Sequence, residues 1–199
     1  IIKDPVIGVF FWIYLWHMTN ERVILDKKKI EIIFNRLCHQ LIENHKDFSN
    51  TVLISLLPRG KYIGKIICNK LEKIINNNIV YGELDISFYR DDLRNQTQPI
   101  IPHKMDMNLS VENKDVVIID DVLYTGRSVR SAIDALMPFG RPKSIELLVF
   151  VDRRLSRHLP IQPDYTGKII DSIDSEKVIV NIEKNNEVKN ILILKSKNE

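Results

Sequence analysis

The fold of this chain is decided by one segment, Val116-Val-Ile-Ile-Asp-Asp-Val-Leu-Tyr-Thr-Gly-Arg-Ser-Val-Arg130. Its first four residues predict a buried strand, and Asp120 and Asp121 follow at the carboxyl end, where α/β sheets bind their ligands. Gly126 lets the backbone approach a ligand closely, just before a helix begins at about Ser128. The free N–H groups and positive dipole end of that helix form a seat for an anion. Paired carboxylates beside such a seat suit a sugar phosphate, with the acids for ring hydroxyls and the amides for the phosphate.

Apolar strands alternate with helices on both sides of this segment. Such alternation indicates a mainly parallel, twisted α/β sheet flanked by helices. Residues 91–113 contain prolines and few periodic apolar residues, which predicts a loop or a flexible hairpin. We expect helices at about 27–44, 61–77 and 128–137, and strands near 51–57, 80–89, 116–119, 144–151, 177–182 and 190–194.

The composition is that of a globular chain. Its 199 residues are 44% hydrophobic and 28% charged, which excludes collagen-like, low-complexity and disordered classes. The formal charge of +3 at pH 7 does not by itself demand a nucleic-acid partner. Cys38 and Cys68 form no CxxC motif and the five histidines are scattered, so no zinc module is expected. Reduced, buried thiols in a cytoplasmic protein are the simplest interpretation.

Residues 1–17 differ from the rest of the chain. The stretch from Val6 to Trp16 is apolar and rich in aromatic residues, but it is shorter than the roughly twenty residues of a membrane-spanning helix. It also lacks the charge pattern and cleavage site of a signal peptide. We interpret Met18 as the biological start, residues 1–17 as an extension upstream of it, and 18–199 as a single domain. The alternative is an interfacial membrane anchor.

The segment 116–130 resembles the phosphoribosyl diphosphate (PRPP) loop of type I phosphoribosyltransferases. Two acids and a Thr-Gly-Arg-Ser turn after four apolar residues are more specific than an ordinary strand-to-helix turn with capping acids. The resemblance implies the type I phosphoribosyltransferase fold, with a small hood and a flexible lid loop. It also implies that Asp120 and Asp121 hold the ribose hydroxyls. The other PRPP-binding residues that it implies in this loop are Tyr124, Thr125, Gly126, Arg127 and Ser128.

Motifs elsewhere in the chain narrow the family. They include Val23-Ile-Leu-Asp26, Asp134-Ala-Leu, Gly140-Arg-Pro, Val151-Asp-Arg, Leu159-Pro-Ile and Asp164-Tyr-Thr-Gly-Lys168. Together with the PRPP loop they are similar to the pyrimidine operon regulators of the PyrR family, which are also uracil phosphoribosyltransferases. The resemblance runs from Met18 to the end of the chain. It implies Mg²⁺-dependent transfer of ribose 5-phosphate from PRPP to uracil, giving UMP and diphosphate.

The resemblance also assigns catalytic roles. Asp120 and Asp121 are the implied metal-binding acids, and with Arg59 they are the implied catalytic residues. Arg59 and Gly60 lie where the family has its pyrophosphate loop, although an ordinary turn is the alternative there. Arg90 begins the expected lid and is available for phosphates.

The sequence predicts the base pocket less specifically than it predicts the PRPP loop. Tyr124 stands where purine-specific relatives carry an acid, which fits a pyrimidine acceptor, while packing on the sheet edge is the alternative. Asp152, Tyr165 and Thr166 are the expected uracil-binding residues, with Tyr165 stacking on the ring. Packing within the hood is the alternative for all three.

A second activity is implied by the family: binding of a pyrimidine leader mRNA, promoted by UMP or UTP, by a homodimer or larger assembly. The expected RNA-binding residues are Arg36, His39, Arg153, Arg157, His158 and Lys168. A solvated charged face is the alternative. The loop before Leu159 is one residue longer than the family pattern, and Gln162 replaces a usual basic residue. A regulator that senses uridine nucleotides without catalysis, and a transferase for another base, remain open.

Overall fold

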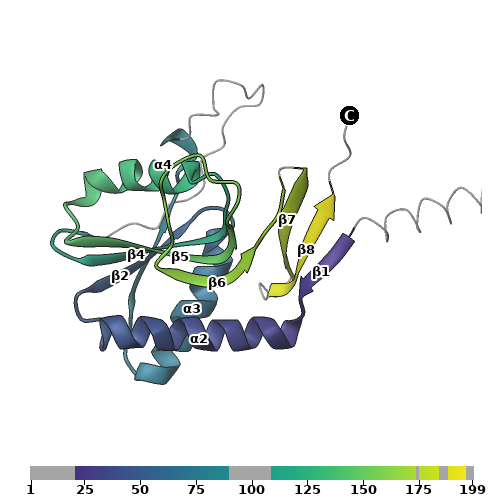
Figure 1. Cartoon of the computed structure of the whole chain (residues 1–199). Coiled ribbons are helices and arrows are strands. Elements are labelled where there is room, and N and C mark those ends of the chain that lie inside the picture. The colour runs from purple at the N-terminus through teal and green to yellow at the C-terminus, as the bar shows by residue number, and fades with distance from the viewer. Residues whose placement is uncertain (1–20, 90–108, 174, 184–187, 196–199) are drawn as a thin grey trace, which may run out of the picture.

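The computed structural model describes residues 21–89, 109–173, 175–183 and 188–195. The strands are β1 (Glu21–Leu25), β2 (Thr51–Leu56), β3 (Val80–Leu84), β4 (Asp115–Leu123), β5 (Ser144–Arg153), β6 (Tyr165–Ile170), β7 (Glu176–Ile182) and β8 (Val188–Lys195). The helices are α2 (Lys27–His45), α3 (Gly60–Ile75) and α4 (Arg127–Leu136), with short 3₁₀ turns η1 (Ser87–Tyr89) and η3 (Met137–Phe139). A five-stranded parallel sheet has the order β3-β2-β4-β5-β6, and a smaller antiparallel sheet has the order β1-β8-β7 (Figure 1). The expected type I phosphoribosyltransferase fold is confirmed.

The helices form where the apolar period predicts them. Helix α2 begins after Asp26, whose carboxylate accepts the backbone N–H of Lys29 at 2.9 Å. Helices α2 and α3 cover one face of the large sheet, and α4 covers the other (Figure 1). The bounds expected at 27–44, 61–77 and 128–137 agree with the structure to within two residues at each end.

Strand β4 passes between two apolar cores, one on each face of the sheet. Residues 116–119 are fully buried, and they alternate between the cores: Val117 packs with Phe34 and Phe150, whereas Ile118 packs with the residues of α4. The rings of Phe34 and Phe150 stack with centroids 4.6 Å apart. Burial on both faces explains why this strand is a continuous apolar run that ends in its two acids.

The small sheet is the hood, and it pairs segments that are far apart in the sequence. Val23 of β1 lies opposite Leu192 of β8, and Val178 of β7 lies opposite Ile193. Strands β1 and β6 were not among the expected strands. The strand expected through residue 89 was too long, because β3 ends at Leu84 and η1 follows.

Both cysteines are free and buried, as expected from the sequence. Burial raises the pKa of the Cys38 thiol to about 11 and that of the Cys68 thiol to about 12. Both thiols are therefore protonated and unreactive at neutral pH.

Some expectations fall on residues outside the described ranges. They concern the extension at 1–17, the start at Met18, and the lid with Arg90. Among the described residues, no helix is both long and apolar enough to cross a membrane.

Candidate active site

The candidate site lies at the carboxyl end of β4, where the chain turns into α4. The turn contains Gly126, whose φ of 92° favours glycine. A Cβ atom there would lie 3.2 Å from Cδ1 of Ile161 and 3.4 Å from Cβ of Leu159. This residue therefore combines a left-handed backbone with close packing, and both features position the N-terminus of α4.

Asp121 is held by Arg59, from the turn before α3, and by the backbone of its own strand. The Nε of Arg59 donates to Asp121 Oδ2 at 2.5 Å, and the same guanidinium donates to the Val180 carbonyl at 3.0 Å. The backbone N–H of Val122 donates to Asp121 Oδ1 at 2.8 Å. Asp121 is only 6% exposed, so this charge is compensated by a charge-assisted hydrogen bond. Arg59 thus links the acid pair to the hood.

The surroundings of Asp120 favour the neutral form of its carboxyl. Burial raises the pKa of its carboxyl well above the usual value, and the adjacent Asp121 carboxylate raises it further. The backbone N–H of Asp121 donates to Asp120 Oδ1 at 2.8 Å, and Arg59 partly offsets the shift. The pair therefore combines a carboxylate bound by Arg59 with a carboxyl whose pKa is raised, and both offer oxygens for vicinal hydroxyls.

Gly60 brings the turn before α3 against the acid pair. A Cβ atom at this residue would lie 2.6 Å from the Ile119 carbonyl oxygen and 3.4 Å from Asp120 Oδ1. Any side chain would force the two segments apart. The turn that carries Arg59 therefore meets the strand end directly, and its role as a pyrophosphate loop stays a prediction.

The predicted PRPP-binding residues of the turn lie together. The Thr125 hydroxyl accepts the Arg127 N–H at 3.5 Å, and Arg127 is exposed. The ring of Tyr124 is covered on one face by Arg153, whose guanidinium carbon lies 4.1 Å from the ring centroid, although the side chain is 37% exposed. The alternative interpretation of Tyr124, an aromatic packed at the sheet edge, thus has a direct structural basis.

Two residues predicted to bind RNA have internal partners instead. Arg153 is 5% exposed and donates to Ser172 Oγ at 2.8 Å and to the Ile173 carbonyl at 3.0 Å. Arg157 binds the Asp152 carboxylate and donates to the Tyr124 carbonyl at 2.5 Å. The expectation that these two side chains face RNA is therefore corrected, because their guanidinium groups are used within the fold.

The other four predicted RNA-binding residues are exposed: Arg36, His39, His158 and Lys168. Arg36 also donates to the carbonyls of Thr166 at 2.9 Å and Gly167 at 2.6 Å, which ties α2 to β6. The structure therefore keeps a smaller basic surface than the sequence predicts.

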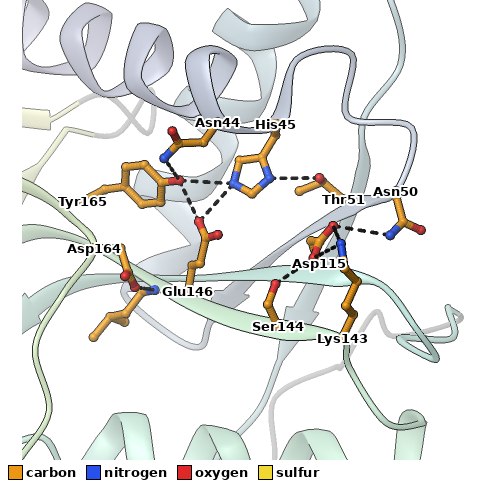
Figure 2. Close-up of polar contacts among 11 residues, drawn as sticks. Asn44, His45, Asn50, Thr51, Asp115, Lys143, Ser144, Glu146, Asp164 and Tyr165 are labelled. Carbon is orange, nitrogen blue, oxygen red and sulfur yellow. Dashed lines mark hydrogen bonds and ion pairs between the residues drawn. The ribbon is translucent and has the colours of Figure 1, made fainter.

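The three predicted uracil-binding residues do not lie together. Asp152 and Thr166 both line a hollow of about 440 Å³ next to the β5–β6 loop. Tyr165 is 3% exposed, and its hydroxyl donates to Glu146 near the amino end of β5 at 2.6 Å (Figure 2). Its side chain thus points toward the amino ends of the parallel strands, opposite to the candidate site at their carboxyl ends. The expectation that Tyr165 stacks on a base is wrong, because its ring is buried and its hydroxyl is taken by that network.

The site has few metal ligands of its own. Within the described residues, no group of three His, Cys, Asp or Glu side chains could hold a metal ion. Asp120 and Asp121 nevertheless offer hard carboxylate oxygens beside the anion seat. Such a donor set fits a Mg²⁺ ion that takes most of its ligands from substrate phosphates and water.

The sequence does not indicate several residues that pack against the site from other elements. Ile161 packs near Gly126, the Val180 carbonyl accepts from Arg59, and Arg157 donates to the Tyr124 carbonyl. Each reaches the site through tertiary contact, so neither spacing nor local composition marks them.

Comparison with known proteins assigns the family. Residues 22–184 match the family model described as phosphoribosyl transferase domain. The chain is 41% identical over 169 residues to the bifunctional protein PyrR of Bacillus subtilis strain 168, covering 83% of this chain and 92% of the relative. It is 38% identical over 175 residues to the bifunctional protein pyrR of Enterococcus faecalis strain V583, covering 88% and 97%.

Solved structures agree with this assignment. A hypoxanthine phosphoribosyltransferase from Staphylococcus aureus aligns with a TM-score of 0.64 at 26% identity, covering 90% of this chain and 96% of that one. The hypoxanthine phosphoribosyltransferase of Trypanosoma cruzi aligns with a TM-score of 0.66 at 19% identity, covering 88% and 97%, and shares the fold. The chain therefore belongs to the phosphoribosyltransferase domain family and, within it, to the PyrR proteins.

Proposed function

We propose that this protein transfers ribose 5-phosphate from PRPP to N1 of uracil. The observation that carries the proposal is the meeting of three features at one sheet edge. The Asp120–Asp121 pair, the amide-lined turn into α4 and the Arg59 side chain all lie at the carboxyl end of β4. Together they offer oxygens for ribose hydroxyls, amides for a phosphate and a cation for a diphosphate.

The reaction breaks the bond between the anomeric carbon and the diphosphate oxygen, and forms a bond from that carbon to uracil N1. The N1 proton is released, and diphosphate leaves with the bonding electron pair. Positive charge develops on the sugar as the bond breaks, so positioning and electrostatics supply the catalysis rather than a protein nucleophile.

Each element then has a separate task. Asp120 and Asp121 hold the ribose hydroxyls, and the turn at Thr125 to Ser128 holds the 5′-phosphate. Arg59 lies beside Asp121 and neutralises the departing diphosphate. A bound Mg²⁺ adds neutralisation of the leaving group, with Asp120 and Asp121 as the protein groups that would hold it.

For the base, the proposal depends on residues at the ends of β5 and β6. Asp152 and Thr166 line one hollow, and Tyr124 stands where purine-specific relatives carry an acid. A neutral aromatic there has no carboxylate for a purine N7 proton, so a pyrimidine is the better acceptor.

The decisive experiment is a steady-state assay with PRPP, Mg²⁺ and uracil. UMP formation is the expected result, with hypoxanthine and orotate failing to compete. Preferential use of hypoxanthine or orotate would replace uracil with another base. No product with any base would leave only the regulatory role.

The proposal includes a second role, the binding of pyrimidine leader mRNA promoted by UMP or UTP. Its basis is the exposed set Arg36, His39, His158 and Lys168, together with the names of the PyrR relatives, which describe them as bifunctional proteins. Gel shifts over a salt series should show affinity that falls steeply with salt, because phosphate contacts release counterions. Self-association into dimers or larger assemblies, and a cytoplasmic location, belong to the same proposal, and light scattering measures the former.

A further inference from the structure

The loop between β5 and β6 binds the PRPP loop through hydrogen bonds to its backbone carbonyls. Arg157 donates to the Tyr124 carbonyl at 2.5 Å. The backbone N–H groups of His158 and Leu159 both donate to the Thr125 carbonyl, at 3.1 and 3.2 Å. Two successive carbonyls of the PRPP loop are thus fixed by three donors from one neighbouring loop.

This arrangement determines where the amides of the PRPP loop point. In a trans peptide the C=O and N–H groups lie on opposite sides of the peptide plane. The Tyr124 carbonyl shares its peptide with the Thr125 N–H, and the Thr125 carbonyl shares its peptide with the Gly126 N–H. Because both carbonyls face the β5–β6 loop, both N–H groups face away from it, toward the open side of the turn where an anion would sit.

We propose that Arg157 is a positioning residue that sets the amide geometry of the phosphate seat. It also binds the Asp152 carboxylate, so one side chain joins the end of β5 to the PRPP loop. The Arg157 side chain is 18% exposed and that of Asp152 is 9% exposed, so water screens the pair weakly. This role rests on the proposed phosphoribosyl transfer, and it replaces the RNA contact that the sequence predicts for Arg157.

An arginine is suited to this position for a geometric reason. Its planar guanidinium donates to two acceptors at once, here a carboxylate and a backbone carbonyl. A lysine is a point donor and reaches one acceptor well. Arg157→Lys should therefore restore only part of what Arg157→Gln loses.

The test compares Arg157→Gln and Arg157→Lys with Arg141→Gln. Arg141 is exposed and lies just before the amino end of β5, away from the PRPP loop. Its replacement by glutamine therefore controls for the same loss of charge. In steady-state assays Arg157→Gln should raise KM for PRPP about tenfold, the effect of one charge-assisted hydrogen bond. The lysine variant should fall between, and Arg141→Gln should match the wild type.

A second measurement does not need turnover. Hydrogen–deuterium exchange should show the amides of His158 and Leu159, which donate to the Thr125 carbonyl, exchanging about tenfold faster in Arg157→Gln, with Arg141→Gln unchanged. If the wild type makes no UMP, the proposed function fails, and this exchange experiment still decides the positioning role. If Arg157→Gln does not fold, Arg157→Lys carries the comparison.

Two results would overturn the inference. One is unchanged amide exchange and unchanged KM for PRPP in both Arg157 variants. The other is a loss of RNA affinity in Arg157→Gln without any effect on PRPP, which would return Arg157 to the RNA surface.

Discussion

The two ends of strand β4 carry acids in opposite electrostatic states. At the amino end, Asp115 accepts hydrogen bonds from Ser144 at 2.8 Å and Asn50 at 3.3 Å and pairs with Lys143 at 3.3 Å (Figure 2). The Ser144 hydrogen bond is the largest cause that lowers the pKa of Asp115, whereas burial raises that of Asp120 at the other end. At the amino end the acid is bound by three neighbouring polar side chains, whereas at the carboxyl end Arg59 pairs with Asp121 and burial disfavours the charge of Asp120.

The amino edge is closed by a second network beside Asp115. His45 Nε2 lies 3.1 Å from Glu146 Oε2, and its Nδ1 lies 3.1 Å from Thr51 Oγ1 (Figure 2). The Tyr165 hydroxyl donates to Glu146 and accepts from Asn44 at 2.7 Å. These side chains bind one another across α2, β2, β5 and β6. The comparison teaches that polar groups bound to one another mark the structural end of the sheet, and that a buried acid with a raised pKa, Asp120, marks the functional end.

The largest expected effect comes from removing the acid pair. Asp120→Asn with Asp121→Asn should lower the rate of UMP formation about a thousandfold or more, because the ribose contacts and the charge near the leaving group are both lost. The circular dichroism spectrum should stay that of the wild type. Turnover retained within tenfold would remove these residues from the proposed mechanism.

A smaller loss is expected when the turn before α3 is displaced. Gly60→Ala places a Cβ atom 2.6 Å from the Ile119 carbonyl, so the turn with Arg59 must move away from the acids. A displacement of this size should lower kcat/KM for PRPP about a hundredfold. Gly82→Ala, in strand β3, offers a matched substitution that should leave kcat/KM unchanged in correctly folded protein.

At the opposite edge the expected effect is on stability alone. Tyr165→Phe leaves the half-buried carboxylate of Glu146 without its hydroxyl donor, which should cost about 1 kcal/mol in urea unfolding. KM for uracil should not change. Tyr62→Phe, on half-buried α3 surface, should cost less than about 0.5 kcal/mol. An increase in KM for uracil in Tyr165→Phe would contradict the corrected position of this ring.

The smallest expected effects concern how the free energy of unfolding depends on pH when the acid at either end of β4 is replaced. The raised pKa of Asp120 means that its ionised form disfavours folding, so Asp120→Asn should stabilise the protein at pH 7 and gain nothing near pH 4. The lowered pKa of Asp115 means that its ionised form favours folding. Asp115→Asn should therefore destabilise the protein at pH 7, by less than about 1 kcal/mol, and the loss should fade as the pH drops below about 4. Urea unfolding across about pH 2.5 to 8 measures both effects; pH slopes of the same sign would refute the comparison.

The sequence by itself determined the elements whose signals are local. The period of α2, the apolar run of β4 and the acids that end it required only neighbouring residues, because helical faces and buried strands repeat over a few positions. Gly126 belongs to the same group, since the turn between the acids and the helix already predicts a glycine that approaches a ligand closely.

Only the tertiary structure decided what long-range contacts control. Strand β1 exists because β8 pairs with it, and Arg157 acts on the PRPP loop because the β5–β6 loop folds against Tyr124 and Thr125. Tyr165 follows Asp164 in a motif that suggests a base pocket. The strand register nevertheless directs its side chain to Glu146 at the amino ends of the strands. Spacing along a chain fixes which face a side chain takes on its own element, but the partner that the face meets depends on how distant elements pack.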